Sequence, residues 1–252
     1  MPGELAAEYE NPAQQARVVT EAWGAKNLFC PVCDSNHLDR SAPNREAVDF
    51  VCPECAESFQ LKSPATALAT RIVDAAYGAM KHAIVSGRTP NLFAMHYDRP
   101  EWLMVDLFVV PRFAYSLSAI EKRKPLAATA RRANWVGCNI LLGNIPPDAR
   151  IPIVKSGVVV SPRSVREQYA RLRPLEKFKH DARGWTLDVL NVVRALNKTE
   201  FSLPEAYPFA PHLQKLHPDN RHVRDKIRQQ LQVLRDLGFV EFLGGGRYQA
   251  RG

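Results

Sequence analysis

Four cysteines in the first quarter of the chain constrain its fold more than any other feature. They form two Cys-x2-Cys pairs, Cys30/Cys33 and Cys52/Cys55, with eighteen residues between the pairs. Four thiolates at this spacing are typical of a structural zinc site, in which each pair forms one knuckle. Four buried apolar thiols and two disulfides are the alternatives.

The N-terminal residues bear on the choice between zinc and disulfides. Residues 1–11 are polar and acidic and have no apolar core like that of a signal peptide. We therefore expect a cytoplasmic, reducing location, where disulfides are disfavoured. The sequence thus predicts Zn²⁺ held by the four paired cysteines. Cys138 has no partner nearby in sequence, and we expect it to pack as a small hydrophobic residue.

Three polar residues lie on the two sides of the second cysteine pair in the sequence. Asp49 precedes that pair, and Gln60 and Lys62 follow it. Apolar and polar side chains alternate in residues 46–51 and 58–63, which predicts two strands, with Gln60 and Lys62 on one face. Two antiparallel strands joined by a zinc knuckle bring Asp49 close to both.

This combination of groups is typical of a metal-dependent phosphodiesterase. Oxygen atoms of Asp49 and Gln60 are ligands suited to Mg²⁺, and Lys62 would lie beside the attacking water. The alternative is that Asp49 and Lys62 are ordinary charges at strand ends, because such spacings also arise by accident. Glu21, on the preceding predicted helix, is a candidate outer metal partner, with a solvated side chain as the alternative.

The net charge of +8 is unevenly distributed along the 252 residues. Residues 1–111 carry nine basic and fourteen acidic side chains, residues 112–182 carry fourteen and five, and residues 183–252 carry eleven and seven. An acidic, metal-holding part followed by a basic centre and tail predicts contacts with the DNA backbone away from the metal site. A solvated basic surface is the alternative. No apolar run approaches the length needed to span a membrane.

The order of predicted elements indicates an α/β domain with the metal residues on central strands. The elements are a helix over residues 11–26, the zinc-bearing hairpin up to residue 62, a helix over 66–85, strands over 91–97 and 103–111, a basic irregular segment over 112–150 and a strand pair over 151–160.

The last seventy residues have the pattern of a winged helix. A helix begins at Gly184 and another at Ser202, which is its N-cap. Residues 220–237 form a basic amphipathic helix, and residues 239–249 form a two-stranded ribbon with a glycine tip. In a winged helix the third helix contacts DNA bases. The candidate contacts on its exposed side, for which a solvated face is the alternative, are Asn220, Arg224, Arg228 and Gln229.

The chain resembles the DpnI family of methyl-directed restriction endonucleases and the related Dam-replacing proteins, from about residue 14 to residue 248. The resemblance is carried by both cysteine pairs and by Ala16-Arg-Val-Val-Thr-Glu-Ala-Trp, Val48-Asp-Phe, Phe59-Gln-Leu-Lys-Ser, Lys122-Arg-Lys-Pro-Leu-Ala-Ala-Thr-Ala-Arg-Arg-Ala-Asn-Trp-Val-Gly-Cys-Asn-Ile, Arg183-Gly-Trp-Thr and Lys226-Ile-Arg-Gln-Gln-Leu-Gln-Val-Leu-Arg-Asp. It implies a zinc-stapled nuclease core of the PD-(D/E)xK type over residues 1–182 and a winged helix over residues 183–252.

The resemblance also implies an activity. The family cleaves double-stranded G-A-T-C only where the adenine carries an N6-methyl group, and both domains can contact the methylated site. We therefore expect a type II restriction endonuclease of the bacterial cytoplasm, acting as a monomer with Mg²⁺ or Mn²⁺. Asp49, Gln60 and the main-chain carbonyl of Leu61 would hold the metal, and Lys62 would orient or activate water.

Matching residues in the basic segment imply contacts with DNA. Arg131 and Arg132 are expected to hold phosphates rather than to contact bases. Trp135 is a candidate apolar wall against the methyl group, with a place in the core as the alternative.

The chain departs from the family motif at one position, where Gln60 replaces a glutamate. An amide keeps a carbonyl oxygen that can reach a metal but lacks the charge that attracts Mg²⁺. The sequence leaves open whether Gln60 is a natural metal ligand or whether a ligand was lost or deliberately removed at this position. A non-cleaving methyl-DNA reader or regulator is therefore the alternative function, and a structural zinc protein without a nucleic-acid role is a distant third.

Overall fold

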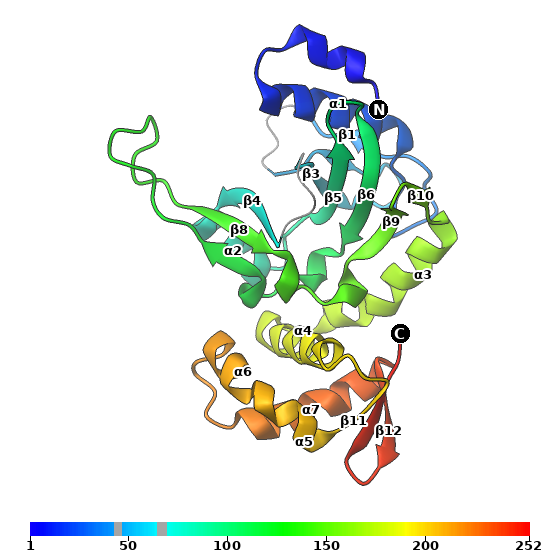
Figure 1. Cartoon of the computed structure of the whole chain (residues 1–252), viewed down its shortest axis with the longest axis vertical. Coiled ribbons are helices and arrows are strands. Elements are labelled where there is room, and N and C mark those ends of the chain that lie inside the picture. Colours follow the sequence, from blue (N-terminus) through cyan, green and yellow to red (C-terminus); the bar gives the residue numbers. More distant parts are fainter. Residues whose placement is uncertain (43–46, 65–69) are drawn as a thin grey trace.

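The computed structural model describes residues 1–42, 47–64 and 70–252. Two parts lie one above the other, and α4 (His180–Ala195) runs between them (Figure 1). The starts of the predicted strand at residue 46 and of the predicted helix at residue 66 lie outside the described residues. No described helix has the length and apolar character needed to cross a membrane.

The larger part contains a mixed seven-stranded sheet in the order β1-β2-β3-β5-β6-β9-β10. Its strands are β1 (Asp39–Arg40), β2 (Phe50–Val51), β3 (Ser58–Lys62), β5 (Asn91–Asp98), β6 (Leu103–Val110), β9 (Ile151–Lys155) and β10 (Val158–Val159). Neighbours are antiparallel except for β3 and β5, which are parallel. The predicted α/β architecture is confirmed, and β3 lies inside the sheet.

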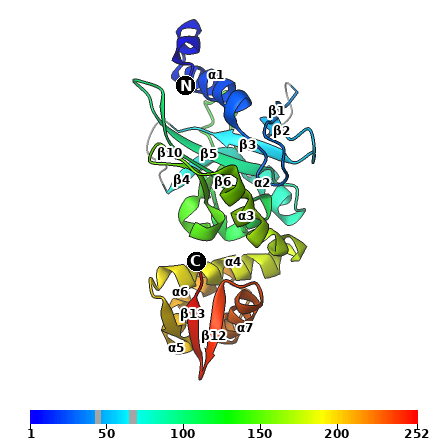
Figure 2. The ribbon, with the colours of Figure 1, turned by 90° about the vertical axis from the view of Figure 1, so that its right-hand side faces the viewer.

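Two capped helices pack against this sheet (Figure 2). α1 (Pro12–Asn27) begins after Asn11, whose side chain accepts from the N–H of Ala13, and α3 (Pro162–Leu172) begins after Ser161. Gly24 lets α1 approach β2 closely, because a Cβ atom there would lie 2.8 Å from the ring of Phe50. The predicted helix over residues 11–26 matches α1.

A separate three-stranded sheet has the order β4-β8-β7, formed by β4 (Arg71–Ala76), β8 (Gly137–Leu141) and β7 (Ile120–Lys122). β4 corrects the predicted helix over residues 66–85, of which only α2 (Tyr77–Val85) is helical in the described part. Ile72 and Asp74 are buried and Arg71 and Val73 are exposed, which is the two-residue period of a strand. Pairing with β8 thus prevails over the helix preference of the alanines.

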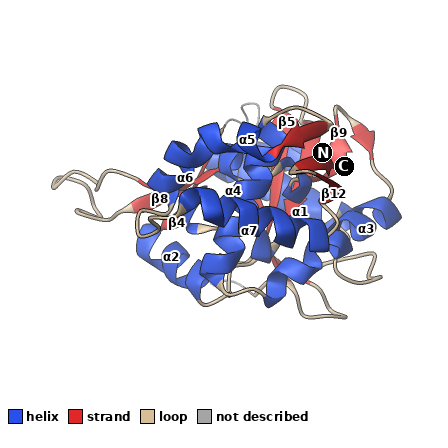
Figure 3. Ribbon diagram, turned by 90° about the horizontal axis from the view of Figure 1, so that it is seen from below, coloured by secondary structure: helices blue, strands red, loops and turns tan. Residues whose placement is uncertain are grey.

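The segment predicted to be irregular, residues 112–150, contains β7 and β8. Between them residues 123–136 form a projecting loop, here called the arm (Figure 1). Figure 3 shows it extending sideways from β8. Short 3₁₀ segments cover Gly3–Glu8, Arg112–Ala114, Leu117–Ala119, Leu142–Asn144, Pro147–Ala149, Arg173–Lys177 and Tyr207–Phe209.

The C-terminal part is a winged helix, as predicted. It consists of α4 (His180–Ala195), β11 (Glu200–Ser202), α5 (Leu203–Ala206), α6 (Ala210–Leu216), α7 (Val223–Asp236), β12 (Val240–Gly244) and β13 (Arg247–Ala250). The strands pair in the order β11-β13-β12, and residues 244–246 form the glycine tip with positive φ angles. The N–H of Ser202 donates to Glu205 at 2.7 Å, which caps α5.

Two predicted helix starts need correction. α4 begins at His180 rather than Gly184, so it crosses the domain boundary predicted between residues 182 and 183. α7 begins at Val223, so Asn220 lies in the preceding turn, where its side chain accepts from the N–H of His222 at 2.8 Å. The helix prediction failed at residue 220 because this local hydrogen bond favours a turn.

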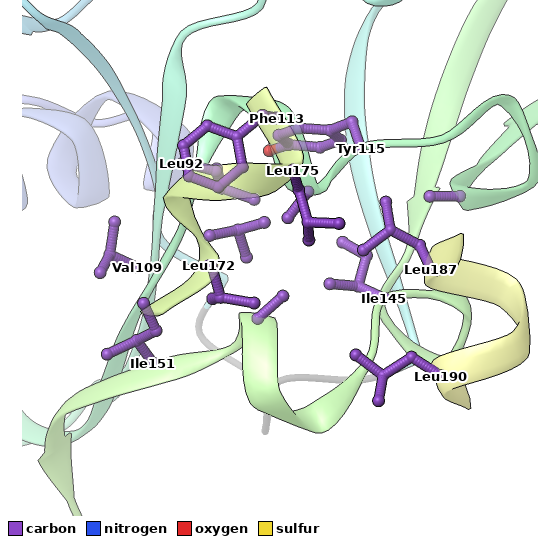
Figure 4. Close-up of a cluster of buried hydrophobic side chains, with 14 of the residues drawn as sticks. Leu92, Val109, Phe113, Tyr115, Ile145, Ile151, Leu172, Leu175, Leu187 and Leu190 are labelled. Carbon is purple, nitrogen blue, oxygen red and sulfur yellow. The ribbon is translucent and has the colours of Figure 1, made fainter. Parts of the chain in front are cut away.

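α4 packs against both parts of the molecule. Leu187 and Leu190 of α4 are fully buried and belong to the same cluster as Ile145, Leu172 and Leu175 of the larger part (Figure 4). The same helix packs against α7 on the side of the winged helix. One continuous apolar core therefore joins the two parts.

Polar contacts support this junction. The guanidinium of Arg194 donates to both oxygens of Asp148 at 2.6 and 2.7 Å, and both side chains are largely buried. Asp188 of α4 accepts from Ser118 of the larger part at 2.6 Å and pairs with His217 at 2.7 Å. The two parts are thus fixed to each other by hydrogen bonds as well as by apolar contacts.

We expect Leu187→Ala to lower the free energy of unfolding by about 2–5 kcal/mol, because it leaves a cavity in the shared core. The two parts should also begin to melt separately, since the variant weakens their junction. Differential scanning calorimetry measures both effects. Val159→Ala is the control, because Val159 is 70% exposed and should change stability by less than about 0.5 kcal/mol. A single unshifted transition in Leu187→Ala would contradict a shared core.

Candidate zinc and nuclease site

The two cysteine pairs meet in space. Their four Sγ atoms lie within 4.8 Å of one another. The Sγ atoms of Cys30 and Cys55 are 3.6 Å apart and those of Cys33 and Cys52 are 3.5 Å apart. These distances are too long for a disulfide and are close to the separation of about 3.8 Å that follows from a tetrahedral ion with 2.3 Å bonds to sulfur. The cluster could hold one zinc ion.

Contacts from α3 fix the first knuckle. The guanidinium of Arg166 donates to the carbonyl of Cys30 at 3.1 Å and to that of Ser35 at 2.9 Å. The N–H of Val32 points at Sγ of Cys30 at 3.4 Å, as in a knuckle that turns its amides toward the sulfurs. The knuckle is therefore attached to α3 and is not a free loop.

Cys30, Cys52 and Cys55 differ in acidity. Burial raises the pKa of Cys30 and raises the pKa of Cys55 to about 11. Burial also acts on Cys52, but hydrogen bonds from the N–H groups of Cys55 and Glu54 and from neighbouring thiols outweigh it and lower the pKa to about 7. A metal cation would favour the thiolate form of all four cysteines.

Asp49 is fastened to β3 by two hydrogen bonds. Its N–H donates to the carbonyl of Phe59 at 2.8 Å, and its carboxylate accepts from the N–H of Leu61 at 2.7 Å. β2 follows at once and pairs antiparallel to β3, with Phe50 opposite Phe59. The structure therefore brings Asp49 beside β3, as the sequence predicts.

Gln60 and Lys62 point to the same side of β3, where they meet a residue that the sequence pattern did not identify. Oδ1 of Asp74 on β4 accepts from Nε2 of Gln60 at 3.1 Å and from Nζ of Lys62 at 2.8 Å. The Asp74 side chain is 2% exposed. The alternation of apolar and polar residues in β4 was the available signal, but the alanine-rich segment was predicted to be helical.

Charged residues of α1 act on the carboxyl group of Asp49. Burial raises the pKa of the Asp49 carboxyl, the N–H of Leu61 lowers it, and the nearby charge of Glu21 raises it further. Glu21 is paired with Arg17 at 2.6 Å. The structure therefore places Glu21 close to Asp49, where an outer metal partner is expected.

The oxygen atoms beside β3 fit a magnesium-like ion. Asp49 offers a carboxylate, Gln60 an amide oxygen and Leu61 a main-chain carbonyl, and Mg²⁺ prefers ligands of this kind. The cysteine cluster instead offers four sulfur atoms, which are soft ligands suited to zinc. The two candidate metal sites are thus chemically distinct, although one hairpin supports both.

The arm carries the predicted DNA contacts of the larger part. Arg131 and Arg132 are exposed, and Trp135 is half-buried at the base of the arm rather than in the core. The guanidinium of Arg132 lies over the Trp135 ring at 5.6 Å, and that ring covers Gly137, where a Cβ atom would lie 2.7 Å from it. The Trp135 ring is therefore partly exposed and has one guanidinium over it.

The side of α7 that was predicted to contact DNA is exposed to solvent. Arg224, Arg228 and Gln229 lie on its outer side, and Ile227 and Leu231 on the opposite side are buried. Arg224 and its neighbours line a groove of about 820 Å³ between α7 and the segment after β11. The N–H and guanidinium groups of this region could contact a phosphate backbone.

One polar residue of this helix is buried. Gln230 is 4% exposed and accepts from Thr186 of α4 at 2.7 Å. It belongs to the packing between α4 and α7 rather than to the exposed face.

Comparison with known families gives two matches. The model of the Dam-replacing family matches residues 1–178, and the model of the Dam-replacing HTH domain matches residues 181–250. The two matches fall on the larger part and on the winged helix, respectively. They confirm the resemblance predicted from the motifs.

We expect the purified protein to contain one zinc ion per chain and Cys52→Ser to lose most of it. The variant should unfold at a lower temperature, because zinc binding contributes to the folding energy of small sites of this kind. Atomic absorption and thermal unfolding measure the two effects. Cys138→Ser is the control, since Cys138 is buried outside the cluster and donates to the carbonyl of Ala75. Full zinc content in Cys52→Ser would refute the site.

Proposed function

The chain belongs to the Dam-replacing family, and we propose that it is a type II methyl-directed restriction endonuclease that cleaves double-stranded DNA at adenine-methylated G-A-T-C sites with Mg²⁺ or Mn²⁺. Family membership supports a methyl-directed nuclease, and the HTH domain supports DNA binding. The observation that carries the proposal is the cluster around β3, where Asp49 accepts from the N–H of Leu61, and where Gln60 and Lys62 on either side of Leu61 share one face of the strand.

Each residue of this cluster has a part in the proposed reaction. Asp49, Gln60 and the carbonyl of Leu61 would hold the metal ion, which would supply polarisation of the phosphate and a more acidic bound water. Lys62 orients the attacking water and offsets the charge that develops on the phosphate. Asp49 also holds β2 and β3 in register through the N–H of Leu61.

Zinc has a structural part in this proposal. The cysteine cluster joins the two ends of the segment between α1 and β3. This link would hold Asp49, which directly precedes the short strand β2, beside β3. The proposal needs no zinc chemistry at the phosphate, because the cluster has four protein ligands and no open position.

Two surfaces contact the DNA in this proposal. α7 places Arg224, Arg228 and Gln229 in the major groove, and Asn220 contacts DNA from the preceding turn. In the larger part, Arg131 and Arg132 hold phosphates, and Trp135 forms the apolar wall against the N6-methyl group.

A second function is favoured by one observation, the amide at position 60. Gln60 supplies no charge to a cation, so a protein with this site could bind methylated DNA and leave it intact. Such a protein would be a methyl-DNA reader or regulator.

We expect the protein with Mg²⁺ to cut plasmid DNA that carries adenine methylation and to leave unmethylated plasmid uncut. Lys62→Ala should be inactive on both, because it removes the cation beside the water, and its affinity for methylated duplex should be unchanged. Gel analysis of the plasmids and fluorescence anisotropy of a labelled duplex measure the two properties. Binding without cleavage by the unaltered protein would favour the reader, and cleavage by Lys62→Ala at the unaltered rate would overturn the site.

We expect Arg228→Ala and Gln229→Ala each to weaken binding of the methylated duplex by about 1–3 kcal/mol if the side chains contact bases. Binding should also weaken as the salt concentration rises, since the contacts with phosphates release counterions. The control is Arg163→Ala, which removes an exposed cation on α3, far along the chain from the winged helix. Equal losses in all three variants would contradict the assignment of α7.

A further inference from the structure

The strongest unassigned group of the molecule is Asp74. It lies on β4, in a different sheet from β3, yet one of its oxygens accepts from both Gln60 and Lys62. Its side chain is 2% exposed, whereas the Lys62 side chain is 25% exposed. A buried carboxylate beside two residues of the proposed site is costly to place unless charges and hydrogen bonds compensate it. Here both are supplied by Gln60 and Lys62.

The contact with Asp74 decides how Gln60 is turned. The two ends of an amide differ only in hydrogen bonding, so a neighbouring group assigns which end is nitrogen. A carboxylate accepts hydrogen bonds, so the end that faces Asp74 is the Nε2 donor. Oε1 then lies on the other side of the amide, and among the described residues it accepts no side-chain hydrogen bond. The oxygen is therefore available to a cation.

The same contact fixes Lys62. A lysine side chain has several rotatable bonds and is ordered at a cost in entropy. The ion pair of 2.8 Å with a buried carboxylate holds the ammonium group on the side of β3 where Gln60 also points.

With Asp74 included, the cluster around β3 has the same net charge as a motif of two carboxylates and one lysine. Asp49 and Asp74 are the carboxylates, Lys62 is the cation and Gln60 is neutral. A glutamate at position 60 would instead put a second carboxylate within about 3 Å of Asp74, and like charges at such distances repel strongly. Gln60 and Asp74 are thus complementary, because the amide donates to the carboxylate that supplies the charge.

We propose that Asp74 is a positioning residue of the nuclease site. It turns Oε1 of Gln60 toward the metal, holds Lys62 beside the water, and supplies the negative charge that position 60 lacks. The role rests on the proposed metal-dependent cleavage and adds a residue outside the motif formed by Asp49, Gln60 and Lys62.

The test measures Mn²⁺ binding to the zinc-loaded full-length protein by isothermal titration calorimetry, with cleavage of methylated plasmid as a second readout. The variants are Asp74→Asn, which removes the charge with little change in volume, and the double variant Gln60→Glu/Asp74→Asn, which moves the charge to position 60. Glu121→Gln is the matched control, since Glu121 is a carboxylate of the same three-stranded sheet that pairs with Arg71 instead.

Asp74→Asn should weaken Mn²⁺ binding about 10–100-fold, the range found when a partner of a metal ligand is removed. Its thermal unfolding and its binding of methylated duplex without metal should match the unaltered protein. The double variant should recover most of the Mn²⁺ affinity and of the cleavage. Glu121→Gln should change neither.

The outcomes separate this role from the proposed function. Unaltered Mn²⁺ binding in Asp74→Asn, or a double variant that binds no better than Asp74→Asn, would overturn the role of Asp74. If Asp74→Asn loses Mn²⁺ and the unaltered protein binds Mn²⁺ but cuts nothing, the role of Asp74 stands and the cleavage proposal fails. Absence of Mn²⁺ binding by the unaltered protein would overturn both.

Discussion

The proposed site depends on the meeting of the two cysteine pairs in one cluster, because this contact constrains the chain between them. The strands that flank it, β1 and β2, have two residues each, so the backbone hydrogen bonds between them are few. Such short strands are marginal without further support. A zinc ion held by two knuckles would close the chain between α1 and β3 and fix β2 beside β3. Arg166 attaches the first knuckle to α3.

β3 positions most of the groups of the proposed site. Its two neighbours are the antiparallel β2 and the parallel β5, which hold the strand inside the sheet. Alternation along β3 sends Gln60 and Lys62 to one side, and the register with β2 brings Asp49 to the N–H of Leu61. The second sheet approaches that side of β3 with Asp74. The proposed nuclease site therefore lies where two sheets meet, with one strand providing most of its groups.

Much of this arrangement was predictable because it is local in sequence. The cysteine spacing, the alternation around Asp49 and Gln60, the cap at Ser202 and the glycine tip of the ribbon all involve residues close together in the chain. These signals predict the zinc cluster, the hairpin and the winged helix. The family resemblance added the methylated G-A-T-C target, which no local pattern contains.

The features that were missed depend on contacts between distant segments. Asp74 lies in an alanine-rich stretch that favours a helix, and only pairing with β8, more than sixty residues later, makes it a strand. Its contact with Gln60 joins two sheets, and no spacing in the sequence predicts that. The burial of Gln230 likewise follows from packing of α7 against α4 within the winged helix, and α4 begins at His180, four residues before the predicted start. At β4, tertiary structure thus prevails over helix propensity.

The central claim is that β3 and its neighbours form a metal site in which the amide oxygen of Gln60 is a ligand. It is tested most directly by a crystal structure of the protein with methylated G-A-T-C duplex and Mn²⁺, using the anomalous signal of the metal. We predict a peak bound by Asp49, Oε1 of Gln60 and the carbonyl of Leu61, with Nε2 of Gln60 still donating to Asp74. A bound duplex with no peak beside β3, or with Gln60 turned away from it, would contradict the claim.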